Sequence, residues 1–137
     1  MPITQFLESD LADEVPPAGI YASTISTAQM RSSQSGNAMI YVVHALEGVA
    51  PAYERVSEYF VLEGASDRGL WLSRRRLVEL FRACGLTPSP GEQIAPGRLV
   101  GARLRVRLKH EEWRDELQLR VVAHLAPVEP QEAALPR

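Results

Sequence analysis

Basic and apolar side chains alternate without a break in one short stretch of this sequence. Three apolar residues, Leu104, Val106 and Leu108, are separated by four basic ones, Arg103, Arg105, Arg107 and Lys109. Successive side chains of a β-strand point to opposite faces, so the pattern predicts a strand with one apolar and one cationic face. Like charges on one face repel unless an anion or acidic neighbours neutralise them. The cationic face could therefore follow a phosphate backbone.

Aromatic side chains supply the second half of a site for single-stranded nucleic acid, because unpaired bases stack on flat rings. The stacking candidates are Tyr41, Tyr59 and Trp113, and Arg31 and Arg55 are further cations. Trp71 is a fourth aromatic, but it lies beside a predicted helix start, and we expect it to be partly buried. For the other three rings, partial burial and base stacking are equally open.

Acidic side chains offer a second interpretation of the cationic strand face. Glu112, Asp115 and Glu116 follow it directly, and residues 1–18 carry four acids and no base. Surface ion pairs are common and contribute little energy. The sequence leaves open whether these acids neutralise the arginines or leave them free for phosphate.

Three consecutive arginines, Arg74, Arg75 and Arg76, form a possible anion site. Ser73 suits the N-cap position of a helix, and Leu72 and Leu77 have the spacing of a hydrophobic staple, so the arginines would fall in the first helical turn. Cations oppose the helix dipole there, whereas a bound phosphate would meet guanidinium groups and free amides. Arginines extending into solvent are the alternative.

Patterns typical of enzymes and metal sites are weak. The sequence has no phosphate loop, nucleophile elbow or metal-spaced set of carboxylates. His44, His110 and His124 are scattered, and we interpret His44 and His124 as satisfied core or interface histidines. The single cysteine, Cys84, excludes an intrachain disulfide and a cysteine-based zinc site. We therefore predict a protein that is not an enzyme and uses no cofactor or metal.

Length and composition are those of one globular domain. The chain has 137 residues, of which 45% are hydrophobic and 23% charged, and its net charge is −2. This net charge does not favour a polyanion partner, so local patches matter more. The chain shows neither a signal-peptide pattern nor an apolar run of membrane-spanning length, and we expect a cytoplasmic protein.

The order of predicted elements indicates a fold. We expect strands at residues 20–30, 38–47, 55–62, 99–109 and 116–126, a loop at 63–70, a helix from Ser73 to Gly85, and a turn at 110–115. Residues expected to point inward on the last strand are Leu117, Leu119, Val121 and Ala123. Three strands, a helix and two strands is the order of the five-stranded OB barrel, whose helix between strands three and four covers one end. Other small α+β folds share this order.

Short motifs along residues 15–126 also resemble a phage and prophage family of unknown function that is associated with recombination and replication genes. They are Pro17-Ala-Gly-Ile-Tyr21, Ser32-Ser-Gln-Ser-Gly-Asn-Ala-Met39, Leu46-Glu-Gly48, residues 77–85 and Leu99-Val-Gly101. That family is similar to OB-type single-stranded-DNA-binding proteins. The resemblance implies DNA binding and partners among phage or host recombination and replication proteins.

The sequence therefore predicts three regions and one function. The regions are an acidic N-terminal arm at residues 1–18, an OB-like domain at 19–126 and a C-terminal tail at 127–137. The predicted function is non-catalytic, non-sequence-specific binding of single-stranded DNA. The alternative is an OB-like module for protein–protein interaction or homo-oligomerisation that does not bind nucleic acid.

Overall fold

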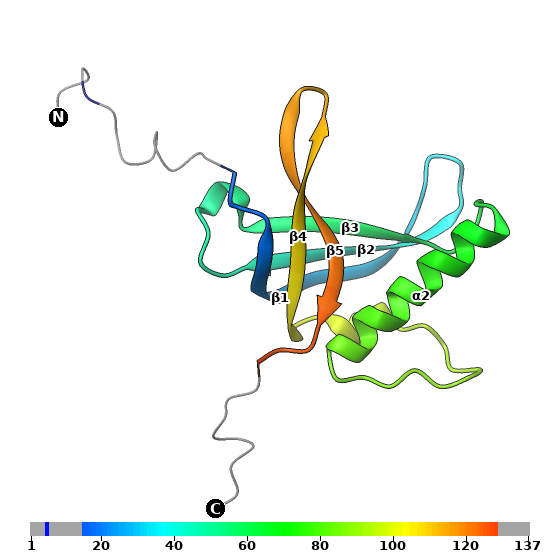
Figure 1. Ribbon diagram of the computed structural model, residues 1–137. Coiled ribbons are helices and arrows are strands. Elements are labelled where there is room, and N and C mark those ends of the chain that lie inside the picture. Colours follow the sequence, from blue (N-terminus) through cyan, green and yellow to red (C-terminus); the bar gives the residue numbers. More distant parts are fainter. Residues whose placement is uncertain (1–4, 6–14, 129–137) are drawn as a thin grey trace, which may run out of the picture.

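Five antiparallel strands form a single sheet in the computed structural model, which describes residues 5 and 15–128 (Figure 1). The strands follow the order β3-β2-β1-β4-β5 across the sheet. The elements are β1 (Gly19–Ser32), β2 (Ala38–Leu46), η1 (Pro51–Tyr53), β3 (Arg55–Val61), α2 (Asp67–Ala83), η2 (Pro96–Leu99), β4 (Arg103–Trp113) and β5 (Glu116–Leu125). The predicted mostly-β fold, with one α-helix after the third strand, is confirmed.

The long strand β1 belongs to both halves of the sheet. Its first residues pair with β4 and the rest pair with β2, and the register shifts at a bulge between Ile25 and Thr27. A bulge bends a strand and increases its twist. The β4–β5 hairpin consequently crosses β2 and β3 at a steep angle (Figure 1).

The hydrophobic core lies between the two halves of the bent sheet. It combines alternate residues of the strands with one stripe of α2 and with Leu99 of η2. Its fully buried members include Ile25, Ile40, Val42, Phe60, Leu80, Leu99, Leu104, Val106 and Leu108. The predicted apolar face of β4 is thus confirmed.

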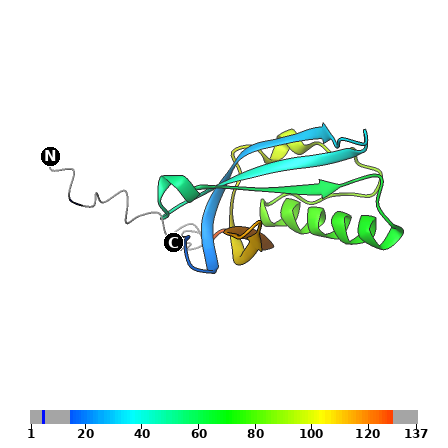
Figure 2. The ribbon, with the colours of Figure 1, turned by 90° about the horizontal axis from the view of Figure 1, so that it is seen from above.

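Backbone hydrogen bonds do not close the sheet into a barrel. β3 and β5 are its two edges, and no ladder joins them in the described part of the chain. α2 packs against both β3 and β5 and so covers the gap between them (Figure 2). Side chains, rather than a ladder, link the two edges.

The helix begins seven residues earlier than the sequence predicts. α2 starts at Asp67, and the Oγ of its N-cap, Ser66, accepts a hydrogen bond of 3.1 Å from the backbone N–H of Gly69. The predicted loop at 63–70 is therefore too long, and Ser73 is not the N-cap. Ser66 and Ser73 both suit the N-cap position. The sequence favoured the later start because Gly69 lies in the first turn of the helix, and glycine has a low helix propensity.

The end of the helix is as predicted. Gly85 has a φ of +84°, and its backbone N–H donates to the carbonyl of Arg82, while the N–H of Leu86 donates to the carbonyl of Phe81. These two bonds define a Schellman motif.

The β4–β5 hairpin is longer than predicted at one end. Residues 110–113 continue β4, and the turn is confined to Arg114 and Asp115, both with positive φ, as in a type I′ turn. At its other end, β4 starts at Arg103 rather than near Leu99, which lies in η2. Leu117 is 43% exposed instead of inward, because it lies near the tip of this hairpin, beyond the core.

A second bulge changes which residues of β5 face the core. The register shifts between Arg107 and Leu108, so that Leu108 pairs with Val121 but Val106 pairs with His124. Val121 and His124 are buried and Ala123 is not, which corrects the prediction for Ala123.

The predicted arm and tail fall largely outside the described residues. At residues 15–18 the chain is attached to the sheet, because the carbonyl of Pro16 accepts from His110 Nε2 (2.7 Å) and that of Pro17 accepts from the Tyr21 hydroxyl (2.6 Å). Among the described residues, no helix is long and apolar enough to span a membrane.

Candidate functional site

An arginine and two tyrosines stack on the outer face of β1, β2 and β3. The Tyr41 and Tyr59 ring centroids are 4.9 Å apart, with an interplanar angle of 38°. The guanidinium carbon of Arg31 lies 3.9 Å from the centroid of Tyr41. Tyr59 is 48% exposed and Arg31 is exposed, so a planar ligand can reach this stack, which we call the platform.

Strand register explains why these three residues meet. Tyr41 of β2 pairs directly with Tyr59 of β3, and Arg31 near the end of β1 is diagonal to Tyr41. The neighbouring residues on the opposite face, Ile40 and Phe60, are fully buried. Burial of one face therefore fixes the other face outward.

A second cross-strand row on the same face carries two cations. Arg103 of β4 pairs with Thr24 of β1, Thr24 pairs with Ala45 of β2, and Ala45 pairs with Arg55 of β3. Arg103 forms an exposed ion pair of 3.2 Å with Glu47, and Arg55 is exposed. Arg55 and Tyr59 are four positions apart along β3, which corresponds to roughly 13 Å.

The rest of the predicted cationic row lies away from the platform. Arg105, Arg107 and Lys109 are on the outer side of β4, in the hairpin that crosses β2 and β3 with the core in between (Figure 1). Arg105 Nε donates to the carbonyl of Ala126 at 2.9 Å. Trp113, near the hairpin tip, is 52% exposed. The structure thus does not bring all nine predicted nucleic-acid contacts onto one surface.

The acidic residues around the turn of the β4–β5 hairpin do not neutralise the cationic row within the described residues. Glu111 pairs with Arg120 of β5 at 2.9 Å, whereas Glu112, Asp115 and Glu116 have no ion pair within the described residues. The acids at positions 8–14 lie outside the described part of the chain. The alternative in which Glu112, Asp115 or Glu116 pairs with the row is therefore not realised within the described residues.

The three consecutive arginines lie in the middle of α2, not in its first turn. The amides there are bonded within the helix, so they do not form the anion site that was predicted at a helix start. Arg76 donates to Glu58 at 2.7 Å, and Arg75 lies 4.8 Å from the ring centroid of Trp71. Trp71 is 54% exposed, contrary to the expected burial, because it lies on the helix face opposite the core stripe.

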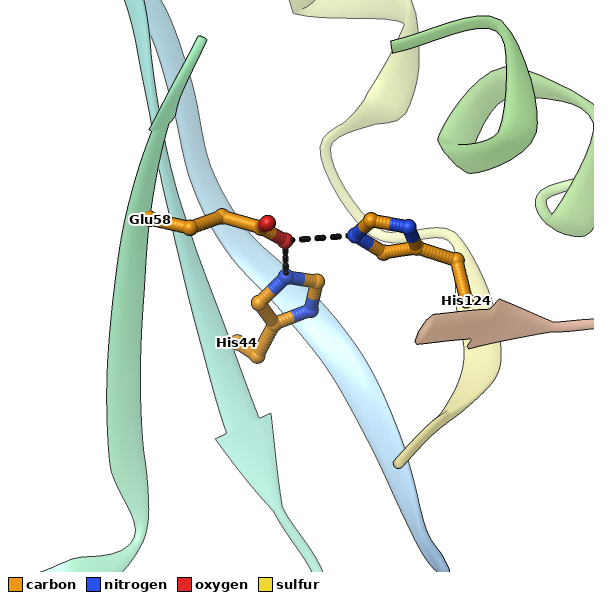
Figure 3. Close-up of side chains that lie close together, drawn as sticks. All are labelled: His44, Glu58 and His124. Atoms are coloured by element: carbon orange, nitrogen blue, oxygen red, sulfur yellow. Dashed lines mark hydrogen bonds and ion pairs between the residues drawn. The ribbon is translucent and has the colours of Figure 1, made fainter. Parts of the chain in front are cut away.

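A network of ionisable groups, buried at His44, Glu58 and His124, links β2, β3, β5 and α2. One carboxylate oxygen of Glu58, Oε2, is 2.6 Å from His44 Nε2 and 2.8 Å from His124 Nε2 (Figure 3). Arg76 contacts the other oxygen of Glu58, and Glu79 Oε1 lies 2.7 Å from His124 Nδ1. The network joins the two sheet edges that no ladder joins.

The hydrogen bonds define the protonation of this network. Burial by itself raises the pKa of Glu58, but the hydrogen bonds from His124 and His44 and the positive charge of His124 outweigh it and lower this pKa to about 2. Burial also opposes charge on His124, but the carboxylates of Glu58 and Glu79 raise its pKa. Both ring nitrogens of His124 therefore donate, as in an imidazolium held between two carboxylates. Its charge and that of Arg76 balance those of Glu58 and Glu79.

Metal ligation by this cluster conflicts with the hydrogen bonding. The ligand atoms of His44, Glu58 and His124 lie within 4.8 Å of one another, which is close enough for one ion, and such donors suit zinc. An ion would displace both Nε2 protons and move the proton of His44 to Nδ1, a buried atom without a partner. The Arg76 cation already occupies the same carboxylate. The protonated network is the arrangement that this geometry supports.

The interpretation of His44 and His124 as core histidines with hydrogen-bond partners is confirmed, but the sequence analysis did not identify their common partner, Glu58. Alternation already placed Glu58 on the inward face of β3, between Val56 and Phe60, and His44 on the inward face of β2. An acid on a buried face requires a partner. The bulge that turns His124 inward leaves no comparable signal in the sequence.

Comparisons with known proteins add no family assignment. A scan of protein-family models gives no match to the chain, and a search of curated protein sequences gives none either. The resemblance to phage proteins stays a prediction.

Proposed function

We propose that the chain binds single-stranded nucleic acid, without sequence specificity, on the outer face of β1, β2 and β3. The observation that carries this proposal is the exposed stack of Arg31, Tyr41 and Tyr59. Bases can stack on Tyr59, and the guanidinium groups of Arg31 and Arg55 can contact phosphates on either side. We further propose a setting in phage or prophage recombination or replication, in the cytoplasm and with single-stranded DNA as the natural ligand.

The strand order supports an OB-type barrel as the finer description of the fold. β1 lies between β2 and β4, and the helix follows β3, as in OB folds. In OB folds, oligonucleotides bind to the face of strands two and three, between the loops after strands one and four. The platform occupies the corresponding face of β2 and β3.

Binding should be modest and sensitive to salt. The net charge of −2 gives no long-range attraction to a polyanion, and the platform has few cations. Each phosphate contact to a single strand contributes about 0.7 to the slope of log affinity against log salt. Two or three contacts would give a slope between about −1.4 and −2.1.

Fluorescence anisotropy with labelled oligothymidine, measured between about 50 and 200 mM salt, tests the proposal. Tyr59→Ala should lower the affinity about 10- to 100-fold, since stacking contributes about 1–3 kcal/mol per base. Arg31→Glu should lower the affinity and also flatten the salt dependence. Absence of binding at low salt would refute the proposal.

Matched substitutions on α2 locate the binding surface. Trp71→Ala removes an aromatic ring as exposed as Tyr59, and Arg75→Glu reverses an exposed arginine, but both residues lie away from the platform. The proposal requires near-normal affinity in these two variants. Loss of binding there, with Tyr59→Ala unaffected, would move the site to the helix.

A protein-interaction module is a second candidate, and a groove beside α2 favours it. The groove has a volume of about 870 Å³ and is lined by exposed apolar and basic residues of α2 and by the end of β5. It can coexist with a nucleic-acid site, because it lies on a different element from the platform.

A further inference from the structure

The groove between α2 and the end of β5 combines two properties of a peptide-binding surface. It is lined by the apolar side chains Trp71, Leu72 and Leu125, and Trp71 and Leu72 are 54% and 43% exposed. It is also lined by Arg75 and Arg82. Large apolar side chains exposed together often mark an interaction site.

The charge of the groove is not balanced locally. Its Arg76 pairs with Glu58 and its Glu79 pairs with His124. Arg74, Arg75 and Arg82 have no ion pair among the described residues. The groove therefore has an excess of positive charge beside its apolar lining, and it is complementary to a segment that is both acidic and apolar.

We propose that residues 1–14 of the same chain bind in this groove. The segment carries Glu8, Asp10, Asp13 and Glu14, has no basic residue, and contains the apolar residues Ile3, Phe6, Leu7 and Leu11. Its acids match the unpaired arginines, and its apolar residues match Trp71, Leu72 and Leu125. The platform is a poorer fit, because it offers a polar, arginine-capped tyrosine stack instead of an aliphatic lining.

The segment is long enough to reach the groove. The described chain resumes next to it, where Pro16 contacts His110, and His110 pairs with Leu119 of β5. Leu125, at the groove, is six positions further along β5, or roughly 20 Å. Fourteen extended residues cover up to about 46–50 Å, so they can pass along β5 and still place Phe6 and Leu7 beside α2.

Acrylamide quenching of Trp71 in the full-length chain tests the proposal. Trp113→Phe leaves Trp71 as the only tryptophan, and the binding of residues 1–14 should protect it from the quencher. In that background, Phe6→Ser/Leu7→Ser and Asp10→Lys/Asp13→Lys should each raise the quenching constant. The constant of the parent chain should also rise in 1 M salt, where the Debye length is about 3 Å.

A charge exchange makes the test specific. Arg75→Glu/Arg82→Glu should raise the quenching constant, and adding Asp10→Lys/Asp13→Lys to it should restore protection. The matched control is Arg31→Glu/Arg55→Glu on the sheet, which should leave quenching unchanged. The proposal fails if none of the segment variants changes the quenching of Trp71, if the sheet control releases it, or if protection disappears on dilution, which would indicate a second copy.

Discussion

Replacing Glu58 by glutamine should destabilise the protein strongly, although it changes only one side-chain atom. Glu58 is 8% exposed and accepts hydrogen bonds from His44, His124 and Arg76. All three partners are donors, so an uncharged amide, with one acceptor oxygen and an NH₂ group, cannot satisfy them. The substitution would leave the buried imidazolium of His124 with one carboxylate, Glu79, and the partly exposed guanidinium of Arg76 with no carboxylate in the described part of the chain.

Two independent arguments give the same magnitude. The pKa of Glu58 falls from 4.5 to about 2 on folding, and a difference of about 2.5 pH units corresponds to about 3 kcal/mol. Removal of one member of a buried ion pair typically costs about 3–5 kcal/mol. For a chain of this length, that loss should lower the melting temperature by roughly 10–15 °C.

Urea and thermal unfolding followed by far-UV circular dichroism measure this loss. Tryptophan fluorescence is a poor probe, because Trp71 and Trp113 are both half exposed in the folded protein. The matched control is Glu111→Gln, which breaks the exposed 2.9 Å pair with Arg120 and should cost less than about 1 kcal/mol.

The comparison of the two variants can refute the reasoning. If the free energies of unfolding of Glu58→Gln and Glu111→Gln differ by less than about 1 kcal/mol, the network around Glu58 does not stabilise the contact between the two sheet edges, β3 and β5. If Glu58→Gln does lower the free energy of unfolding by the expected amount, a second test follows. His124→Gln should then destabilise the Glu58→Gln variant less than it destabilises the parent protein, since the two residues act through one network.

Three further predictions follow from single groups. The pKa of Glu58 is lowered, so its contribution to the free energy of unfolding is present above pH 4.5 and is lost as the pH falls toward 2. The pKa of His124 is raised, so its contribution to the free energy of unfolding is complete below pH 6.5 and is lost as the pH rises through the pKa of the folded state. Urea unfolding across pH should therefore show greatest stability between about 4.5 and 6.5, and a maximum above pH 8 would contradict this. Gly85→Ala should cost about 1 kcal/mol in urea unfolding, since φ at this position is +84°, and an unchanged midpoint would argue against the Schellman ending. Burial raises the pKa of Cys84 to about 11, so iodoacetamide at pH 8 should modify it far more slowly than the same thiol in urea, and equal rates would contradict its burial.

Strand alternation was enough to predict the platform. A two-residue period assigns Tyr41 and Tyr59 to one face of β2 and β3 once Ile40 and Phe60 are assigned to the other. Which cations accompany them was not predictable in the same way. Arg55 and Arg103 share a cross-strand row with Thr24 and Ala45, whereas Arg105 and Arg107 pair with Ala22 and Ile20, outside the part of β1 that pairs with β2. This register is set by the three-dimensional pairing of the strands, which no short motif records.

The start of α2 shows a different limit. Ser66 and Ser73 are both good N-caps, and local signals favoured Ser73 because Leu72 and Leu77 suit a staple. In the structure Ser66 Oγ accepts from the backbone N–H of Gly69, whereas Ser73 lies inside the helix and its buried Oγ has no hydrogen-bond partner among the described residues. Capping preferences of about 1 kcal/mol are alike for the two serines, so capping signals alone could not choose between them.

β3 connects the buried network to the platform, because Glu58 and Tyr59 are adjacent residues on its opposite faces. Only β2 holds β3 by a backbone ladder, and across the open edge the described polar contact is that of Glu58 with His124. The position of Tyr59 therefore depends on both the ladder and the network. If the β2–β3 ladder is sufficient to hold Tyr59 in place, Glu58→Gln should lower the apparent oligonucleotide affinity only in proportion to the fraction of protein that is unfolded. The reason is that Tyr41 still packs against Tyr59, with ring centroids 4.9 Å apart. An affinity loss in fully folded Glu58→Gln protein would instead mean that the network fixes the platform itself.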